Sequence, residues 1–319
     1  MNDWRPSADR AALQLRARLN AYIRAFFAER GVLEVETPLL SQHGTTDRHI
    51  ESFAVPVGSG QTRWLRTSPE FALKRLLAAG IGDCYELGRV FRYGEAGRRH
   101  NPEFSMLEWY RVGWDHQRLI GEVEQLVQGA LALVDRKVTT ARISYRELFV
   151  RELGLDPWRA SDAALQTALA GFDIKADGLE RDDWLDLLFS YRLQPNFAAD
   201  ELLSVYDFPA SHCALARLRG EVGEQVAERF ESFLGPVELA NGYHELIDAE
   251  EQAARFATDL EWRLQHQRPG PPADALLLSA MQHGLPACAG VALGVDRLLA
   301  TLAEDCDISV VLAISWIRA

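Results

Sequence analysis

Two strand-like runs joined by a long polar loop constrain the fold of this chain more than any other feature. The runs are CYELGRVFR (84–92) and EFSMLEWYRV (103–112), and the loop between them spans residues 93–102. Two such runs with a turn-rich connection predict an antiparallel hairpin, here with an unusually long tip. The fold is therefore expected to contain an antiparallel sheet, to which the rest of the chain adds further strands and covering helices.

Other strand-like segments occur near both ends of the chain, with a helical region between them. Residues 7–30 and 70–80 have apolar residues at helical spacing, and Ser68-Pro69-Glu70 is a typical helix start. The middle, roughly 115–200, is mostly helical in pattern, and VDRLLATLAE (295–304) predicts another helix. The remaining strand candidates are VLEVETP (32–38), IESFAVPV (50–57), TRWLRT (62–67), LLSVYDF (202–208), ESFLGPVELANGYHELI (231–247), AGVALG (289–294) and ISVVLAISW (308–316). This order predicts a single α+β domain over residues 1–319, an antiparallel sheet flanked by helices with a helical insertion.

The balance of charge disfavours one class of function and leaves another open. Lysine and arginine total 34 against 46 aspartate and glutamate, which gives a formal net charge of −12. A protein that wraps nucleic acid needs a dense positive surface, so this class is disfavoured. ATP requires only a few well-placed arginines and is compatible with the composition.

Cysteine spacing and hydropathy predict a cytoplasmic protein. The four cysteines, at positions 84, 213, 288 and 306, form no C-x-x-C pair, which argues against a zinc framework or a secreted disulfide scaffold. The N-terminal segment MNDWRPSADR is polar, unlike a signal peptide. No stretch approaches the ~18 consecutive apolar residues of a membrane helix, so no membrane association is expected.

The first segment whose residues suggest a chemical function is FRYGEAGRRHNPEF (91–104), which forms the hairpin tip. Arginine presents a planar fork that suits phosphate oxygens, and Phe104 is placed to stack on a base. Taken by itself, the segment is more typical of a solvated hairpin tip, since exposed charges are the norm.

The second segment is FESFLGPVELANGYHEL (230–246), which contains two carboxylates seven residues apart. With a break at Gly235-Pro236, Glu231 and Glu238 would converge on one cation, and Mg²⁺ prefers one or two carboxylates plus substrate phosphates. Asn241-Gly242 is a turn signal, after which Tyr243 and Glu245 point to the same strand face. A purely structural strand pair remains the alternative.

The third segment is GVALGVDRLLATLAE (290–304), where glycines precede a helix start that contains Asp296-Arg297. Glycines at this point let a triphosphate approach the backbone and an arginine. The segment is not a P-loop, because no G-K-[ST] occurs in the chain. A tight strand-to-helix turn without a ligand is the alternative.

Together these segments resemble the signature motifs of class II aminoacyl-tRNA synthetases. GVLEVETPLL resembles motif 1, FRYGE…RRHNPEF motif 2, and GVALGVDR motif 3. TSPEFALKRLL, HNPEFSMLEWY and ELANGYHEL are similar to the substrate pocket of the lysine branch. The resemblance runs from about Ser7 to the C-terminus and implies the class II catalytic fold.

Two departures narrow the resemblance to the elongation factor P–(R)-β-lysine ligase family. Motif 1 begins near residue 31, which leaves no room for the N-terminal anticodon-binding OB-fold of lysyl-tRNA synthetases. Ala292 replaces the middle glycine of G-x-G-x-G-x-D-R. That family implies ATP-dependent activation of (R)-β-lysine as an adenylate and its transfer to a lysine of elongation factor P. It also implies a homodimer, whereas tRNA is an unexpected partner.

The resemblance assigns expected roles to residues. Arg92 and Arg297 would hold the α- and γ-phosphates as catalytic residues, and Glu231 and Glu238 would bind Mg²⁺. The implied ATP site comprises Arg92, Tyr93, Gly94, Glu95, His100, Asn101, Phe104, Glu238, Leu239, Gly294 and Arg297. The implied substrate pocket comprises Ser68, Pro69, Glu70, Glu108, Tyr110, Asn241, Tyr243, Glu245 and Ala292. Three of these are carboxylates, as a diamine requires, and the methyl of Ala292 is a candidate selector between α- and β-lysine by sterics.

Two alternatives to a protein ligase stay open. Motif 2 of the family usually reads F-R-N-E-E, whereas Tyr93 and Gly94 stand here and only Glu95 remains. This departure favours a catalytically silent regulatory paralogue, and a free-standing lysine-activating enzyme that charges tRNA is the other alternative. Phe26 and Phe27 precede motif 1 and belong either to the dimer interface or to the chain's own core.

Overall fold

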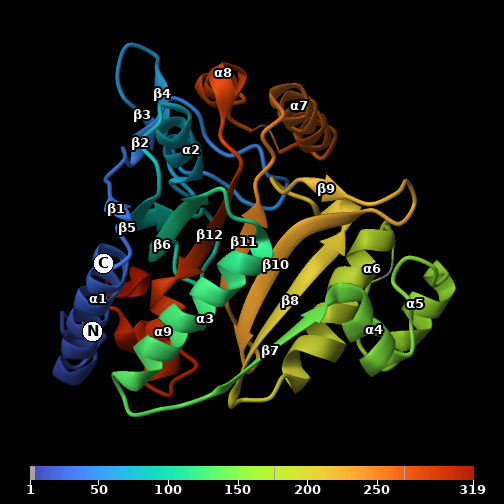
Figure 1. The fold of residues 1–319 in the computed structure, drawn as a ribbon, viewed down its shortest axis with the longest axis horizontal. Helices are drawn as coiled ribbons and strands as arrows, with labels where there is room; N and C mark the ends of the chain where they lie inside the picture. Colours follow the sequence, from blue (N-terminus) through green and yellow to red (C-terminus); the bar gives the residue numbers. More distant parts are fainter. Residues whose placement is uncertain (1–3, 176, 269) are drawn as a thin grey trace.

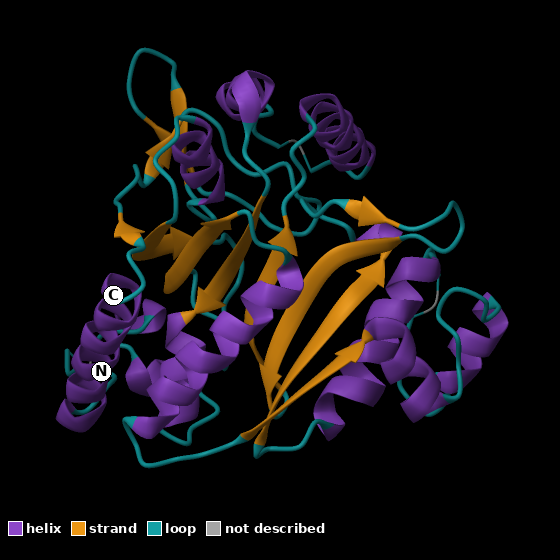
Figure 2. Cartoon of the chain, viewed as in Figure 1, coloured by secondary structure: helices purple, strands orange, loops and turns teal. Residues whose placement is uncertain are grey.

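The computed structural model describes residues 4–175, 177–268 and 270–319, and its main feature is a nine-stranded sheet within these ranges. Its strands lie in the order β1-β5-β6-β12-β11-β10-β8-β7, and β9 pairs with β10 (Figures 1 and 2). In that order the bounds are Leu33–Glu34, Cys84–Phe91, Glu103–Val112, Cys288–Gly294, Val237–His244, Val226–Leu234, Glu201–Pro209 and Thr139–Ser144, with Leu218–Arg219 for β9. Pairing is antiparallel except for β1 with β5 and β7 with β8.

Three helices form the principal core with the centre of the sheet. They are α1 (Arg10–Ala28), α3 (His116–Ala132) and α9 (Val295–Leu302). Helix α3 packs across β10, β11 and β12, as Figure 1 shows, and α9 packs on β6 and β11. Leu107 and Trp109 of β6 belong to this core, so the alternate residues Glu108 and Tyr110 face the opposite side of the sheet.

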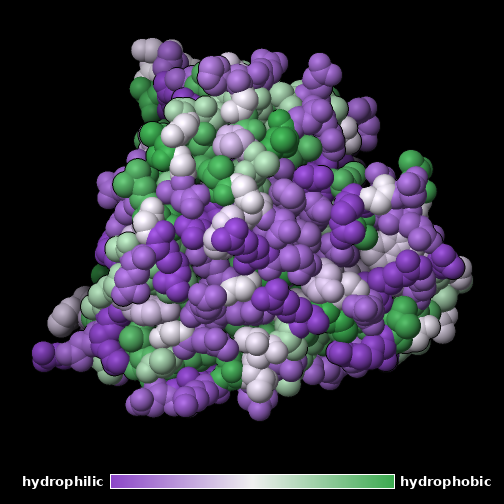
Figure 3. Space-filling model, in the orientation of Figure 1, coloured by the Kyte–Doolittle hydropathy of each residue, from purple (hydrophilic) through white to green (hydrophobic). Residues whose placement is uncertain are grey.

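Two further groups of elements surround the sheet. Helices α2 (Glu70–Ala78), α7 (Ala249–Gln265) and α8 (Ala275–Gly284) gather at the top of Figure 1, near the small sheet of β2 (Leu40–Ser41), β4 (Thr62–Leu65) and β3 (Ala54–Pro56). Helices α4 (Tyr145–Leu153), α5 (Asp162–Ala168) and α6 (Arg181–Leu188) pack at the β7–β8 end around a separate apolar cluster. Polar side chains cover most of the face in Figure 3, with apolar ones scattered among them. Among the described residues, none of the helices combines the length and apolarity that crossing a bilayer requires.

Most of the predicted elements are confirmed, and the local signals explain why. Helix α2 begins at Glu70 as predicted, but its N-cap is Pro69 rather than Ser68. The Ser68 side chain accepts a hydrogen bond from the Glu70 backbone N–H at 2.9 Å just before the helix. The hairpin is confirmed as β5 paired with β6. Phe26 and Phe27 are buried in the chain's own core, where the Phe27 ring stacks on Tyr85 with centroids 4.4 Å apart. These two aromatic side chains are therefore not available to a dimer interface.

Three expectations from the sequence are wrong. The helical middle contains the strand β7, which pairs in parallel with β8, a long-range contact that no local pattern reveals. The segment 308–316 is no strand but contains the short helical turn Ile308–Val311, because its apolar residues are buried at positions 308 and 311, a helical spacing. Asn241 and Gly242 lie inside β11 rather than in a turn; the Phe230 ring lies where a side chain at 242 would stand.

Candidate active site

A cavity of about 510 Å³ lies on the side of the sheet opposite the α3 core, and most predicted site residues line it. Strands β6, β11 and β12, the start of α2, the start of α9 and the hairpin tip all contribute. The predicted residues in its lining are Ser68, Pro69, Glu70, Arg92, Glu95, His100, Asn101, Phe104, Glu108, Tyr110, Glu238, Leu239, Asn241, Tyr243, Glu245, Ala292, Gly294 and Arg297. Tyr93, Gly94 and Glu231 lie outside this lining.

Strand alternation and register bring the substrate-pocket residues together. Glu108 and Tyr110 are two apart on β6, and Asn241 and Tyr243 are two apart on β11. Between these strands runs β12, where Ala292 lies opposite Glu108 on one side and Asn241 on the other. The methyl group predicted to select the substrate therefore sits on the floor of the cavity.

A β-bulge places Glu238 in the same cavity. Asn241, Tyr243 and Glu245 are odd-numbered, so simple alternation would turn Glu238 to the other face. The register shifts between Ser232 and Phe233, where the pairing of β10 with β11 steps from Ala240 to Glu238. The extra residue, Leu239, restores Glu238 to the cavity face. This irregularity is invisible in the sequence pattern.

Glu108 is a buried carboxylate held by two hydroxyl donors. The Ser68 hydroxyl donates to Oε2 at 2.7 Å, and the Tyr110 hydroxyl donates to Oε1 at 2.8 Å. Burial, with the nearby Glu70 charge, raises the pKa of Glu108 to about 8. The side chain therefore holds a proton at neutral pH, and a cation bound beside it would favour its ionised form.

Lys74 is the main residue that the sequence reasoning missed. Its Nζ lies 2.6 Å from Glu70 Oε1 and 2.6 Å from Glu245 Oε2. Burial disfavours its charge, but the carboxylates of Glu245 and Glu70 outweigh burial and raise its pKa. The i,i+4 spacing of Glu70 and Lys74 on α2 was the available signal.

The sequence did not single out Gly290, which matters to the site because it has no side chain. A Cβ at this position would lie 2.3 Å from a Tyr110 ring carbon and 2.5 Å from Glu245 Oε1. Tyr110 and Glu245 therefore lie directly over the β12 backbone. Only glycine allows this close approach.

The other end of the cavity carries arginines suited to phosphate. Arg297 donates through Nη1 to Glu238 Oε2 at 3.1 Å, and its Nη2 lies 2.8 Å from His100 Nε2. Asp296 anchors the start of α9 by accepting hydrogen bonds from the Ser105 backbone N–H at 2.7 Å and from Arg16 at 2.5 Å. Burial and the Arg297 charge lower the pKa of His100, so this histidine is neutral at pH 7.

Arg92 lies beside Phe104 in the cavity lining. Its guanidinium carbon is 5.2 Å from the Phe104 ring centroid, and its Nη1 is 3.7 Å from Glu95. Its Nε is buried without a hydrogen-bond partner. The Arg92 side chain lines the cavity, and a guanidinium there is suited to binding an anion.

The two predicted metal ligands are each paired with an arginine. Arg229 Nη2 donates to Glu231 Oε1 at 2.5 Å, and Arg297 holds Glu238. Glu231 and Glu238 also repel each other, and Glu231 is partly buried, with 15% of its side chain exposed. The sequence reasoning missed Arg229, which lies on the same strand face as Glu231.

Tyr93 and Gly94, where motif 2 departs from its usual form, turn away from the cavity. The Tyr93 side chain is 60% exposed and its ring meets Phe53 edge-on, with centroids 5.2 Å apart. Gly94 has a φ of +80°, a conformation that favours glycine, so the residue serves the backbone turn. Glu95 remains in the lining.

Comparison with known proteins agrees with this geometry. Residues 1–315 match the family of class II tRNA synthetases (D, K and N). The chain is 48% identical to the elongation factor P–(R)-beta-lysine ligase of Yersinia enterocolitica over 304 residues, 93% of this chain and 92% of the relative. It is 44% identical to that of Haemophilus influenzae, covering 96% and 95%, and 45% identical to that of Edwardsiella ictaluri, covering 100% and 99%. The chain therefore belongs to the class II tRNA synthetase family and, within it, to the elongation factor P–(R)-β-lysine ligases.

Proposed function

We propose that this protein activates (R)-β-lysine with ATP and transfers it to a lysine side chain of elongation factor P in the cytoplasm. The observation that carries the proposal is one cavity with a carboxylate cluster at one end and arginines at the other. A diamine fits the first end and a triphosphate the second. The names of the relatives support the identity of substrate and acceptor.

The charge of the cluster matches a diamine. Glu70, Glu108 and Glu245 contribute three negative charges when ionised, and Lys74 neutralises one of them. Two negative charges remain, equal to the two ammonium groups of β-lysine. Glu108 and Tyr110 would bind the side-chain ammonium, with Ser68 and Pro69 beside them at the start of α2. Tyr243 and Asn241, joined by a hydrogen bond of 3.1 Å, would flank the methylene chain.

Activation needs positioning rather than a general base. The substrate carboxylate is already ionised and attacks the α-phosphorus in line, forming the P–O bond of the adenylate as the bond to pyrophosphate breaks. Arg92 would stabilise charge on the α-phosphate oxygens, and Arg297 would hold the γ-phosphate after exchanging its contact with Glu238. The acceptor lysine amine of elongation factor P then attacks the acyl carbon and releases AMP.

The nucleotide would lie along β6 and β11. Phe104 would stack on adenine, with Glu95 or a backbone carbonyl reading its amino group, since Tyr93 and Gly94 face elsewhere. His100 and Asn101 would lie near phosphates and ribose, and Leu239 and Gly294 would contribute backbone.

Glu231 and Glu238 fit Mg²⁺ by their chemistry. Both offer the hard carboxylate oxygens this ion prefers, and they are close enough to repel each other electrostatically, a repulsion that a divalent cation would relieve. The bound ion would neutralise charge on the phosphate oxygens. For this arrangement Arg229 and Arg297 must release the carboxylates that they now hold.

Elongation factor P and a second copy of the chain are the expected macromolecular partners. The side chains of Leu33, Leu39 and Leu40, in and after motif 1, are 53%, 42% and 44% exposed. They are the apolar candidates for a homodimer interface, in place of the buried Phe26 and Phe27. With a net charge of −12, a tRNA acceptor is not expected.

Intact-mass spectrometry of elongation factor P tests the proposal directly. Incubation with the enzyme, ATP and (R)-β-lysine should add the mass of one β-lysyl group, and Arg297→Ala should abolish the addition. Omission of ATP and replacement of β-lysine by α-lysine are the controls. An unmodified authentic acceptor would refute the proposal, and lysine-dependent pyrophosphate exchange without modification would point to a tRNA-charging enzyme.

A further inference from the structure

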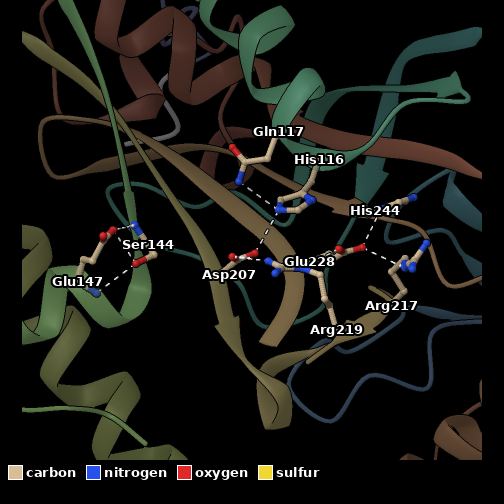
Figure 4. Close-up of polar contacts among 9 residues, drawn as sticks. All are labelled: His116, Gln117, Ser144, Glu147, Asp207, Arg217, Arg219, Glu228 and His244. Atoms are coloured by element: carbon tan, nitrogen blue, oxygen red, sulfur yellow. Dashed lines mark hydrogen bonds and ion pairs between the residues drawn. The ribbon is translucent and has the colours of Figure 1, made fainter. Parts of the chain in front are cut away.

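A group of metal-ligating side chains lies on the side of the sheet opposite the cavity. His116 begins α3, Glu228 is on β10 and His244 ends β11. One ring nitrogen of each histidine and one carboxylate oxygen of Glu228 all lie within 4.8 Å of one another. Figure 4 shows the three side chains gathered, with Asp207, Arg217 and Arg219 around them.

Three buried polar atoms of the group make no hydrogen bond of good geometry within the described residues: His116 Nδ1, Glu228 Oε2 and His244 Nδ1. Glu228 Oε2 is held by ion pairs instead, 2.8 Å from His244 Nδ1 and 3.0 Å from Arg217 Nε. His116 Nδ1 has no such contact, and a buried polar atom is almost always satisfied, so this nitrogen requires an explanation. A metal ion that accepts a lone pair from each of the three atoms provides one.

The surroundings have the form of an outer ligand shell. His116 Nε2 lies 3.2 Å from Asp207 Oδ1 and 3.3 Å from Gln117 Nε2. A ring proton on Nε2 that is donated to Asp207 would leave the lone pair on Nδ1. Arg219 holds Asp207 Oδ2 at 2.6 Å and Glu228 Oε1 at 3.0 Å, so that Glu228 Oε2 is the oxygen beside His244 and Arg217. Metal-bound histidines usually have such a carboxylate behind them.

A β-bulge produces this arrangement. Ala227 pairs with Phe208 and Phe230 with Tyr206, so Glu228 and Arg229 on β10 lie opposite the single residue Asp207. Asp207 adopts a left-handed φ of +57° at this point. Bulges of this kind redirect side chains and persist where they serve a site. Here the bulge sends Glu228 toward the histidines, while Arg229 turns to the other face of the sheet, beside Asn241 and Tyr243.

We infer that His116, Glu228 and His244 form a binding site for a zinc-like divalent cation, with water as the fourth ligand. Two imidazoles and one carboxylate are a ligand set for Zn²⁺ rather than Mg²⁺. Tetrahedral bonds of about 2.0–2.2 Å place ligand atoms roughly 3.4 Å apart, so the site closes with side-chain shifts of about 1 Å. The ion would take the place of Arg217, whose Nε is 3.0 Å from Glu228 Oε2 and whose side chain is half exposed.

The site would stabilise the back wall of the proposed substrate pocket. His244 lies between Tyr243 and Glu245, which line the cavity on the other face of the strand. A bound ion would tie the end of β11 to β10 and to the start of α3. The ion's role would be structural and separate from that of Mg²⁺ at the nucleotide. The inference of this site does not depend on the proposed activity.

Metal titration of chelator-treated, full-length protein tests the inference. Co²⁺ should bind at one ion per chain with the visible absorption of a four-coordinate site, Zn²⁺ should displace it, and Zn²⁺ should raise the thermal midpoint. His244→Gln should weaken binding by more than about 100-fold, because even an outer-shell partner contributes about 10- to 100-fold. Arg217→Gln removes the competing cation and should tighten binding by about tenfold or more.

The control is His266→Gln, which removes an exposed histidine at the C-cap of α7 and should leave binding unchanged. Absence of saturable Co²⁺ binding would overturn the inference, as would binding that His266→Gln weakens and His244→Gln does not. Arg217→Gln alters an exposed side chain and decides the question even if His244→Gln does not fold. Unchanged affinity in that variant would also count against the site.

Discussion

Lys74 places its ammonium 2.6 Å from the Glu245 carboxylate, and both side chains are buried beneath the cavity. The pair joins α2 to the end of β11, two elements that are about 170 residues apart in sequence. Because the ammonium also meets Glu70, it sets the net charge that the cavity offers to a ligand.

Removal of Lys74 should therefore destabilise the fold strongly. Lys74→Met leaves Glu70 and Glu245 without their cation, and breaking a buried pair in this way costs about 3–5 kcal/mol of unfolding free energy. Denaturant unfolding measures the loss, and Lys74→Met with Glu245→Gln should recover part of it. Lys137→Met, at an exposed lysine, is the matched control; equal small effects of both single variants would contradict this account.

Glu108 should make both stability and substrate binding depend on pH. Its pKa of about 8 in the folded protein lies above the ordinary 4.5, so the folded state holds an extra proton between these values. Stability from this group is then full below about pH 4.5 and is lost as pH rises through about 8. Unfolding free energies at pH 5.5 and 8.5 should differ less in Glu108→Gln than in wild type, whereas Glu29→Gln should leave the difference unchanged.

The same ionisation should tighten diamine binding at high pH. An ammonium bound between Glu108 and Tyr110 needs the carboxylate form, so KM for the diamine should fall as pH rises toward and through 8. Glu108→Gln should raise KM by at least tenfold and remove this pH dependence. A KM profile that is the same in wild type and Glu108→Gln would show that Glu108 does not meet the substrate.

The arginines at the phosphate end should affect the chemical step. Arg297→Ala and Arg92→Ala should each lower the rate of lysine-dependent pyrophosphate exchange by about 10²–10³, the typical loss of one transition-state donor. Arg98→Ala, on the same hairpin tip but outside the cavity lining, should have little effect. Exchange that survives in Arg297→Ala would remove this residue from the catalytic set.

Gly290 should not tolerate a methyl group. The Cβ of Gly290→Ala would overlap Tyr110 and Glu245, and forced overpacking of this kind costs about 1–3 kcal/mol. Unfolding free energy should fall and KM for the diamine should rise together. Gly97→Ala is the control, since a Cβ there meets no atom within 4 Å; an equally mild Gly290→Ala would argue against the close approach.

Ala292 should influence the choice between α- and β-lysine. Its methyl group lies between Glu108 and Asn241 on the cavity floor, where the shifted amino group of one isomer would meet it. Ala292→Gly should change the ratio of kcat/KM for the two isomers by about tenfold, the effect of one methylene-sized contact. Competition assays with both isomers measure it, and an unchanged ratio would eliminate the hypothesis.

The sequence by itself determined the elements and residue types that local chemistry specifies. The strand-like runs and the helix start after Ser68 were enough to predict the α+β class and the hairpin. The charged motifs, through their resemblance to class II synthetases, predicted most of the cavity residues. These predictions succeed because side-chain periodicity and helix capping depend on residues only a few positions apart. The short turn at 308–311 escaped because a brief apolar run does not distinguish a strand from a helical turn.

Only the tertiary structure decided what depends on pairing between distant segments. Strand β7 exists because β8 is beside it, and Glu238 faces the cavity because a bulge changes the parity of β11. Lys74 meets Glu245 because the fold brings α2 to the end of β11. The group of His116, Glu228 and His244 likewise comes from three separate elements and a bulge. Register and bulges are set by the whole sheet, so no local pattern in the chain encodes them.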